Sequence, residues 1–306
     1  MPYKTVKDLS LKEYFGPGHR LCQGCGAGII ARLVTKVAGD NTIIVNATGC
    51  LEVASSFYPD TAWGLPWIHV AFENAAASAS GIRAAYTSMM KKGLRDSSPN
   101  IIAFAGDGGT ADIGIQALSG AMERGDHFTY ICYDNEAYMN TGIQRSSATP
   151  YGAWTTTSPP GKISPGQKTG KKDLVAIAVG HGIKYTATAN VAYLVDAANK
   201  VEKALNTAGA TFIHFLSPCT PGWRIDTASS VKISKLAVQT ALWPLYEVVD
   251  GQYITTVKIA KRLPVSEYLK AQGRFRHLVS KAEEVAKIQA VADKLAEKFG
   301  YGPLGP

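Results

Sequence analysis

The sequence has few charged residues and few cysteines. Charged residues make up 18% of its 306 residues and hydrophobic ones 46%, which excludes a disordered chain and predicts a sizeable buried core. No uncharged apolar run is long enough to span a bilayer, and the first 14 residues contain no apolar segment of a secretion signal. We therefore expect a cytoplasmic protein without a membrane partner, whose five cysteines do not form disulfides.

Nucleic-acid-binding signatures are also absent. The net charge is +8, but we find no basic–aromatic stacking module and no helix-turn-helix pattern, so no nucleic-acid partner is expected. Much of the positive excess follows residue 251. Such an excess is typical either of a solvated surface or of docking onto an acidic protein.

Two apolar runs of strand length end on polar residues. The first ends on Gly-Asp-Gly at 106–108, and the second, residues 128–133, ends on Asp-Asn at 134–135. In a parallel sheet both ends reach the same carboxyl edge, where open α/β sheets bind ligands. Glycines leave the backbone free to approach a phosphate, and a carboxylate can bind a hard cation. Gly-Asp-Gly alone is typical of an ordinary turn, but the matched Asp-Asn favours a site for a metal-bound diphosphate.

Strands and helices alternate along most of the chain. The pattern predicts strands at 41–46, 101–106, 128–133, 184–189 and 211–216, and helices at 29–37, 74–90, 113–124, 173–182 and 191–208. This order predicts right-handed βαβ units and a doubly wound, mainly parallel sheet of the α/β class. We also expect a helical turn at 9–15, an irregular aromatic segment at 63–73 and a long loop at 139–172.

The pattern changes after residue 226. Helices are predicted at 231–243 and 280–299, with a short hairpin at 246–257. We therefore divide the chain into a cofactor-binding domain, residues 1–228, and a C-terminal extension, residues 229–306. The extension is expected to pack on the domain or on a partner subunit.

Four cysteines are positioned to reach the predicted carboxyl edge. Cys22 and Cys25 lie in a glycine-rich loop before a helix, and Cys50 and Cys219 each follow a strand end. Four thiolates suit either a [4Fe–4S] cluster or structural zinc, and a redox dithiol at Cys22 and Cys25 is a third reading. Cys132 lies in mid-strand and is expected to be a buried core residue.

The combined motifs resemble the β subunits of the 2-oxoacid:ferredoxin oxidoreductases, and among them the pyruvate:ferredoxin oxidoreductases (pyruvate synthases). The resemblance covers residues 16–224, with Cys-x-x-Cys-Gly, Thr-Gly-Cys, Gly-Asp-Gly, Asn-Thr-Gly and Ser-Pro-Cys in the order of the family. The Gly-Asp-Gly with its downstream Asn looks like the thiamine-diphosphate motif. The loop at 149–156 resembles the pyruvate and branched-chain members more than the 2-oxoglutarate ones.

The resemblance assigns a role to each group of residues. The ligands of a [4Fe–4S] cluster would be Cys22, Cys25, Cys50 and Cys219. The ligands of Mg²⁺ would be the side chains of Asp107 and Asn135 and the carbonyl of Ala137. The residues beside thiamine diphosphate would be Gly106, Gly108, Gly109 and Cys50, with Asn140 and Thr141 near the reacting carbon as catalytic residues.

The resemblance also implies a reaction and partners. Pyruvate would be decarboxylated oxidatively with coenzyme A to acetyl-CoA and CO₂, with electrons passing reversibly through the cluster to ferredoxin. Because only one α/β domain is predicted, partner subunits of α, γ and δ type should complete the thiamine pocket, and the chain alone should be inactive. The alternatives are another 2-oxo acid, such as a branched-chain one, a zinc-stapled subunit without catalysis, and a non-redox thiamine-diphosphate decarboxylase.

Two positions depart from the pattern of some family members. Ala27 stands where some carry a glutamate directly after Cys-x-x-Cys-Gly, so no cofactor role is assigned there. Asn135 stands where some carry a threonine, and either residue offers a neutral oxygen.

Overall fold

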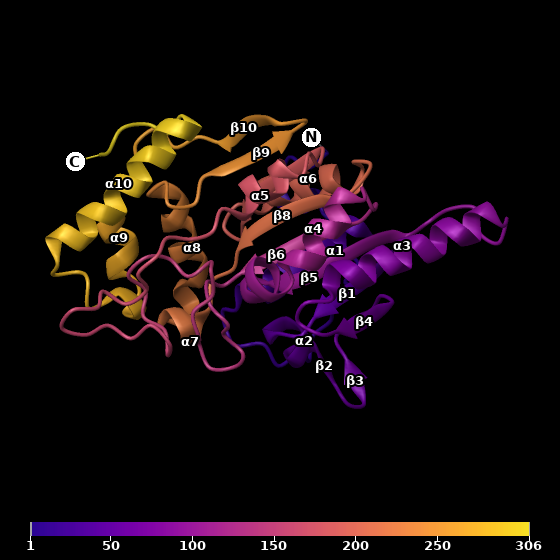
Figure 1. The fold of residues 1–306 in the computed structure, drawn as a ribbon, viewed down its shortest axis with the longest axis horizontal. Helices are drawn as coiled ribbons and strands as arrows, with labels where there is room; N and C mark the ends of the chain where they lie inside the picture. Colours follow the sequence, from indigo (N-terminus) through magenta and orange to yellow (C-terminus); the bar gives the residue numbers. More distant parts are fainter. Residues whose placement is uncertain (1, 306) are drawn as a thin grey trace.

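The computed structural model describes residues 2–305 and contains one large sheet with helices on both faces (Figure 1). The strands of this sheet are β1 (Thr42–Ala47), β4 (Trp67–Val70), β5 (Asn100–Gly106), β6 (Thr129–Asp134), β7 (Tyr185–Asn190), β8 (Thr211–Leu216), β9 (Leu245–Val249) and β10 (Gln252–Val257). Their order is β10-β9-β7-β8-β6-β5-β1-β4. Every pairing from β7 to β4 is parallel, and β9 pairs antiparallel with both neighbours. The predicted α/β class and mainly parallel sheet are confirmed.

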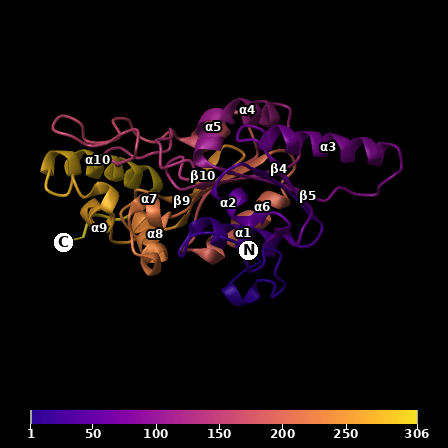
Figure 2. The same ribbon diagram turned by 90° about the horizontal axis from the view of Figure 1, so that it is seen from below.

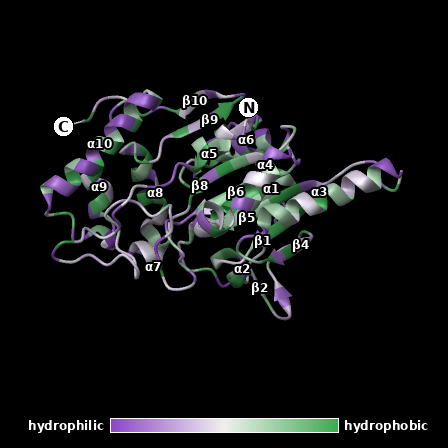
Figure 3. Ribbon diagram, in the orientation of Figure 1, coloured by the Kyte–Doolittle hydropathy of each residue, from purple (hydrophilic) through white to green (hydrophobic). Residues whose placement is uncertain are grey.

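The two faces of the sheet are covered by different helices. α1 (Gly26–Ala38) and α6 (Leu194–Leu205) cover one face, and α3 (Ala75–Lys91), α4 (Ile115–Glu123) and α5 (Leu174–Gly180) cover the other (Figure 2). Successive strand residues point to opposite faces, so Ile44 and Ile102 pack under α1 while Val45 and Ala103 pack under α3. Both faces are therefore buried, and Figure 3 shows the central strands as mostly hydrophobic.

The remaining helices are short or lie near the C-terminus. They are α2 (Cys50–Ser55), α7 (Thr220–Trp223), α8 (Ser230–Gln239), α9 (Val265–Lys270) and α10 (Ala282–Phe299). Figure 1 shows α7 to α10 gathered with the loop 139–172 at one end of the sheet. A small ribbon, β2 (Ser56–Phe57) with β3 (Asp60–Thr61), stands apart from the main sheet. Within residues 2–305, no helix combines the length and apolar character needed to cross a membrane.

The C-terminal extension contributes to the main sheet. The hairpin of β9 and β10, predicted at 246–257, adds two strands beside β7. Thr188 of β7 donates a hydrogen bond to the carbonyl of Pro244 at 2.7 Å, and Tyr246 stacks on Phe299 of α10 with ring centroids 4.1 Å apart. The division at residues 228 and 229 stays a prediction, because the sheet continues across it.

Several short elements differ from the sequence-based expectations. The turn expected at 9–15 is wrong: a 3₁₀ turn occupies Val6–Asp8 instead, because Thr5 and Asp8 form a capping box around it. The segment expected to be irregular at 63–73 contains β4, an edge strand whose two central residues are exposed and so carry no buried-strand pattern. The helices α2, α7 and α9 were not anticipated because each has six residues or fewer.

Four neighbouring strands end at one edge of the sheet. β8, β6, β5 and β1 lie side by side and run in the same direction. The segments that follow them are the ones that carry Cys219, Asn135, Asp107 and Cys50. The topology therefore brings the predicted site residues to the same edge, as expected for parallel strands.

Candidate cofactor site at the carboxyl edge of the sheet

One cleft at this edge gathers the predicted cofactor residues. Its lining includes Cys50, Gly106, Asp107, Gly108, Gly109, Asn135, Ala137, Asn140 and Thr141. Sequence reasoning missed the other lining residues, which are Thr48, Gly49, Phe72, Tyr133, Tyr138 and Met139. Thr48 and Gly49 belong to the Thr-Gly-Cys motif, and Tyr138 and Met139 lie between Asn135 and the Asn-Thr-Gly motif, so their neighbourhood could have identified them. Phe72 and Tyr133 carry no such signal.

The glycines after β5 let other groups approach the backbone. A Cβ atom on Gly108 would lie 2.3 Å from the ring of Tyr138, whose hydroxyl donates to the Gly108 carbonyl at 3.1 Å. A Cβ atom on Gly109 would lie 3.1 Å from the carbonyl of Phe72. Gly106 is different, because a Cβ atom there would make ordinary contacts of 3.5 Å with Tyr133. Close packing against the floor of the cleft therefore requires glycine at 108 above all.

Three oxygen-bearing groups converge beside these glycines. The terminal atom of the Asn135 amide that faces them lies 2.8 Å from the carbonyl oxygen of Ala137 and 3.0 Å from Oδ1 of Asp107. In an octahedral Mg²⁺ site with metal–oxygen distances of about 2.1 Å, neighbouring oxygens are about 3.0 Å apart. An Asn135 oxygen at this position has that spacing, whereas an amide nitrogen there donates to both oxygens instead. The donor set therefore fits Mg²⁺.

The side chain of Asp107 is buried and forms no ion pair with the rest of the described chain. Its side chain is 1% exposed, and Ser146 donates a hydrogen bond to its Oδ2. Burial, followed by the negative charge of Asp134, raises the pKa of Asp107 well above its usual range. Among residues 2–305, no lysine, arginine or histidine lies within ion-pair distance of it. A bound divalent cation would supply the missing positive charge.

The two predicted catalytic residues lie at the exposed rim of the cleft. Thr141 donates to the side-chain oxygen of Gln144 at 2.6 Å, and Asn140 forms a hydrogen bond with the thiol of Cys50 that opposes the rise in its pKa. The buried hydroxyl of Tyr133 also lines this cleft and has no hydrogen-bond partner among residues 2–305. The cleft therefore presents the hydroxyl of Tyr133 to a ligand.

The four predicted cluster ligands face a common region. Burial raises the pKa of Cys50 and of Cys219 to about 12, and the charges of the neighbouring thiols, including Cys22 and Cys25, contribute to each rise. Burial also raises the pKa of Cys25, with a further contribution from Cys22. The raised pKa values keep the thiols of Cys25, Cys50 and Cys219 protonated at neutral pH unless a metal holds them as thiolates.

The thiols do not by themselves form a closed metal site. Within the described residues, no group of three or more His, Cys, Asp or Glu side chains is close enough together to hold a metal ion. Two of the three segments that carry the thiols are nevertheless joined, because the Gly26 amide donates to the Pro218 carbonyl at 3.0 Å. The Gly222 amide points at the sulfur of Cys219 at 3.4 Å. Cys132, by contrast, is fully buried in mid-strand, as predicted.

Comparisons with known proteins address the same region. The family model described as "Thiamine pyrophosphate enzyme, C-terminal TPP binding domain" matches residues 47–215. A relative named pyruvate synthase subunit PorB, from Methanocaldococcus jannaschii, is 55% identical and aligns over 96% of this chain and 99% of its own length. The ketoisovalerate oxidoreductase subunit VorB of Pyrococcus furiosus is 44% identical, over 95% of this chain and 96% of its own length.

A solved structure has the same fold. It is the 2-oxoglutarate:ferredoxin oxidoreductase from Magnetococcus marinus with 2-oxoglutarate, coenzyme A and succinyl-CoA bound, and one of its chains matches with a TM-score of 0.57. The match covers 74% of this chain and 81% of the other at 17% identity. At that identity the likeness concerns the fold alone.

Proposed function

The chain belongs to the thiamine-pyrophosphate-binding enzymes and, within them, to the family of pyruvate synthase PorB subunits, and we propose that it catalyses the pyruvate synthase reaction together with its partner subunits. In this reaction pyruvate and coenzyme A give acetyl-CoA and CO₂, and two electrons pass one at a time through a [4Fe–4S] cluster to ferredoxin. The reverse reaction, the reductive carboxylation of acetyl-CoA, uses the same site.

The proposal rests on one observation: oxygen donors suited to Mg²⁺ and a cysteine thiol line the same cleft. The oxygens of Asp107, Asn135 and Ala137 suit Mg²⁺, and Cys50 lines the same cleft on the side of the other thiols. Thiamine diphosphate supplies the carbanion chemistry that releases CO₂ from a 2-oxo acid. A cluster held at Cys50 would lie next to that chemistry, so electrons would have a short path.

The residues of the chain have separate tasks in this proposal. Asp107, Asn135 and the carbonyl of Ala137 hold Mg²⁺, and the backbone at Gly108 and Gly109 approaches the diphosphate. The four thiolates Cys22, Cys25, Cys50 and Cys219 hold the cluster. Asn140 and Thr141 lie at the mouth of the cleft, where they can contact the substrate.

Partner subunits complete the site in this proposal. The chain contributes one α/β sheet, so a second domain that covers the other half of thiamine diphosphate has to come from a subunit of α, γ or δ type. The resulting complex would act on ferredoxin in the cytoplasm. The likeness to VorB favours one alternative, in which the substrate is a branched-chain 2-oxo acid.

The test is an assay of the complex purified with its native partners. Pyruvate and 2-oxoisovalerate are compared in parallel, each with coenzyme A and oxidised ferredoxin, and ferredoxin reduction and acyl-CoA are measured. We expect kcat/KM to be higher for pyruvate. A preference for 2-oxoisovalerate selects the branched-chain alternative, and no CoA-dependent reduction with either acid refutes both.

Iron and zinc analysis of the same preparation tests the cluster. A brown protein with broad visible absorption and about four irons for each copy of this chain is expected. A colourless protein that contains zinc would exclude the redox role of the four cysteines.

A further inference from the structure

The turn that carries two proposed metal ligands has an unusual backbone. It spans residues 134–137, and Glu136 within it has a φ of 72°, in the left-handed region that residues other than glycine rarely adopt unless their surroundings hold them there. Its amide donates to Oδ1 of Asp134 at 2.8 Å. Its carbonyl accepts from the hydroxyl of Thr149 at 2.7 Å, and the carbonyl of Asn135 accepts from the indole of Trp223 at 2.9 Å.

Buried ion pairs hold the side chains of this turn. Lys171, from the long loop, contacts Asp134 at 2.8 Å and Glu136 at 2.6 Å. Arg274, from the C-terminal extension, donates to the other oxygen of Glu136, and His214 of β8 lies 2.9 Å from Asp134. The side chains of Asp134, Glu136 and Arg274 are each at most 4% exposed, so solvent screens these pairs little.

The charges of this network balance. Asp134 and Glu136 supply two negative charges, and Lys171 and Arg274 supply two positive ones. Asp107 is left as the carboxylate without a protein cation, on the side where Mg²⁺ would bind. The network therefore fixes the turn without competing for the charge that attracts the metal.

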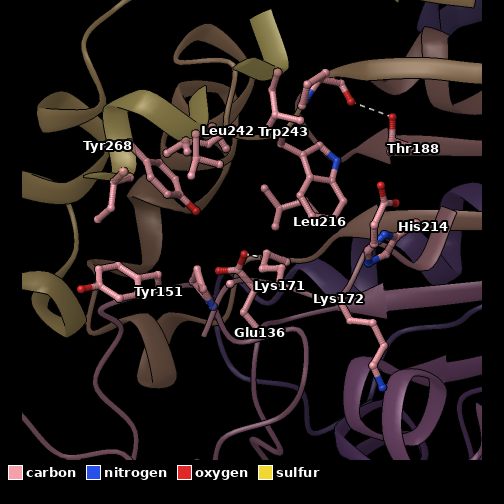
Figure 4. Close-up of a pocket in the computed structure, with 18 of the residues that line it drawn as sticks. Glu136, Tyr151, Lys171, Lys172, Thr188, His214, Leu216, Leu242, Trp243 and Tyr268 are labelled. Carbon is pink, nitrogen blue, oxygen red and sulfur yellow. Dashed lines mark hydrogen bonds and ion pairs between the residues drawn. The ribbon is translucent and has the colours of Figure 1, made fainter. Parts of the chain in front are cut away.

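Close-packed side chains do not fill the space on the side of the turn that faces away from Asp107. A cavity of about 550 Å³ lies there between the sheet, the long loop and the C-terminal helices. Figure 4 shows Glu136 and Lys171 in contact at its wall, which Trp243 and Tyr268 also line, and Nζ of Lys171 lies 4.7 Å from the ring centroid of Trp243. Because that side of the turn faces open space, directional ion pairs rather than close-packed side chains hold its conformation.

Arg274 contacts two residues next to Asn135: Glu136, which follows it in the chain, and Trp223, which donates a hydrogen bond to its carbonyl. Besides Glu136, its guanidinium lies 4.2 Å from the ring centroid of Trp223, the indole that bonds to the Asn135 carbonyl. The side-chain oxygen of Gln272 accepts from Nε of Arg274 at 2.9 Å and so fixes its direction. A single side chain of the extension thus orients both contacts.

We propose that Arg274, with Lys171, is a positioning residue that holds residues 134–137 so that Asn135 and the Ala137 carbonyl face Asp107 as Mg²⁺ ligands. The C-terminal extension is then part of the cofactor site. This inference rests on the proposed function, since it assumes that Mg²⁺ and thiamine diphosphate bind in the cleft.

The experiment uses the complex assembled with its partner subunits and stripped of Mg²⁺ with EDTA. Mg²⁺ is titrated at a fixed concentration of thiamine diphosphate, and cofactor binding is followed by quenching of tryptophan fluorescence. Arg274→Met keeps most of the side-chain length but removes the charge. We expect it to raise the half-saturating Mg²⁺ concentration about 10–100-fold, the usual cost of losing a residue that orients metal ligands. At saturating Mg²⁺, thiamine-diphosphate affinity should return to within about threefold of the wild type.

The matched control is Arg262→Met. Arg262 is also a buried arginine of the extension, 7% exposed, but its partners are Asp293 at 2.9 Å and the carbonyl of Gly302 rather than residues 134–137. Its Mg²⁺ requirement should stay within about threefold of the wild type, and Arg274→Lys should recover part of the loss because it keeps a charge for Glu136. Iron content and thermal midpoint are recorded for each variant.

Two results overturn the proposal. One is an Arg274→Met complex with the Mg²⁺ requirement of the wild type, and the other is an equal rise in Arg262→Met. If Arg274→Met does not assemble, Lys171→Met replaces it, since it removes the charge that pairs with Asp134 and Glu136. A several-fold rise then supports the proposal and no rise refutes it. A wild-type complex that binds no thiamine diphosphate would instead refute the proposed function.

Discussion

At the scale of single residues, the site depends on one buried carboxylate. Asp107 is enclosed, receives a hydrogen bond from Ser146 and has no protein cation beside it. Gly108 next to it leaves room for Tyr138. Both residues belong to one short motif, which is why the sequence alone could single them out.

Asp107→Ala should abolish Mg²⁺-dependent binding of thiamine diphosphate. The change removes the charged oxygen from the proposed metal site, so we expect a loss of affinity above about 100-fold, more than the loss of an orienting residue causes. The visible spectrum of the cluster should remain, because the cysteines are untouched. Equilibrium binding measures the affinity and a visible absorption spectrum reports the cluster, both on the assembled complex. Asp112→Ala serves as a folding control. Unchanged affinity would remove Asp107 from the metal site.

Glu13 gives the chain a specific response to acid. Arg32 and Lys36, at 2.6 and 2.7 Å, hold the pKa of this carboxyl at about 2, below its usual value of 4.5. A lowered pKa in the folded state means that the ion pairs stabilise the fold above pH 4.5 and that this stabilisation is lost as the pH falls toward 2. Glu13 is partly exposed, so the effect is small.

Thermal unfolding of Glu13→Gln measures this effect. At pH 7 its midpoint should lie about 1–2 °C below that of the wild type, and at pH 3 the difference should shrink. Glu297→Gln, which removes a carboxylate of α10, serves as the control. A difference that stays constant between the two pH values would contradict the assignment of the low pKa to Glu13.

At the scale of elements, the start of α1 is joined to the loop that follows β8. The Gly26 amide bonds to Pro218, and the Cys25 amide bonds to the Cys22 carbonyl at 3.1 Å. These contacts bring the Cys-x-x-Cys loop to Cys219, almost 200 residues later in the chain. The glycine at 26 makes the close approach possible.

Gly26→Ala should lower the iron content of the purified complex. The added Cβ would lie 2.5 Å from Cδ and 2.8 Å from N of Pro218, so the two cysteine loops would have to separate. We expect less than about half of the wild-type iron, since a cluster bound by four thiolates tolerates little displacement. Gly180→Ala, at a position with no atom within 4 Å of the new Cβ, is the control. Full iron occupancy in Gly26→Ala would show that the loops need no contact at this point.

At the scale of the whole molecule, the candidate cofactor cleft lies at the carboxyl edge of a single sheet. Eight of the ten strands within residues 2–305 belong to that sheet, and the C-terminal extension completes it at the edge beyond β7. The cleft is open at the rim where Asn140 and Thr141 are exposed. A partner domain would have to cover this side.

The chain purified alone should not decarboxylate pyruvate, even with Mg²⁺ and thiamine diphosphate in excess. Mixing the chain with its partner subunits and coenzyme A should restore the reduction of ferredoxin by pyruvate. CO₂ release from labelled pyruvate measures the first step without an electron acceptor. Turnover by the lone chain would contradict the need for a second domain.

The sequence by itself determined the order of the core elements and the identity of nine of the residues that line the cleft, among them Asp107 and Asn135. Strand-length apolar runs predict β5, β6 and β8, and parallel strands must deliver the residues that follow them to one edge. Asp107, Asn135 and the four cysteines could be chosen because each stands directly after such a run or in a glycine loop. Short elements such as β4 and α7 could not be predicted, because they carry too few residues to show a period.

Only the tertiary structure decided what holds residues 134–137, the turn that carries two of the proposed metal ligands. Lys171 and Arg274 contact Glu136 from 35 and 138 residues away, and no local pattern marks either residue. The same applies to the contact between Gly26 and Pro218. Such pairs depend on where the long loop and the C-terminal extension come to lie, and that position results from packing over the whole chain rather than from the spacing of neighbouring residues.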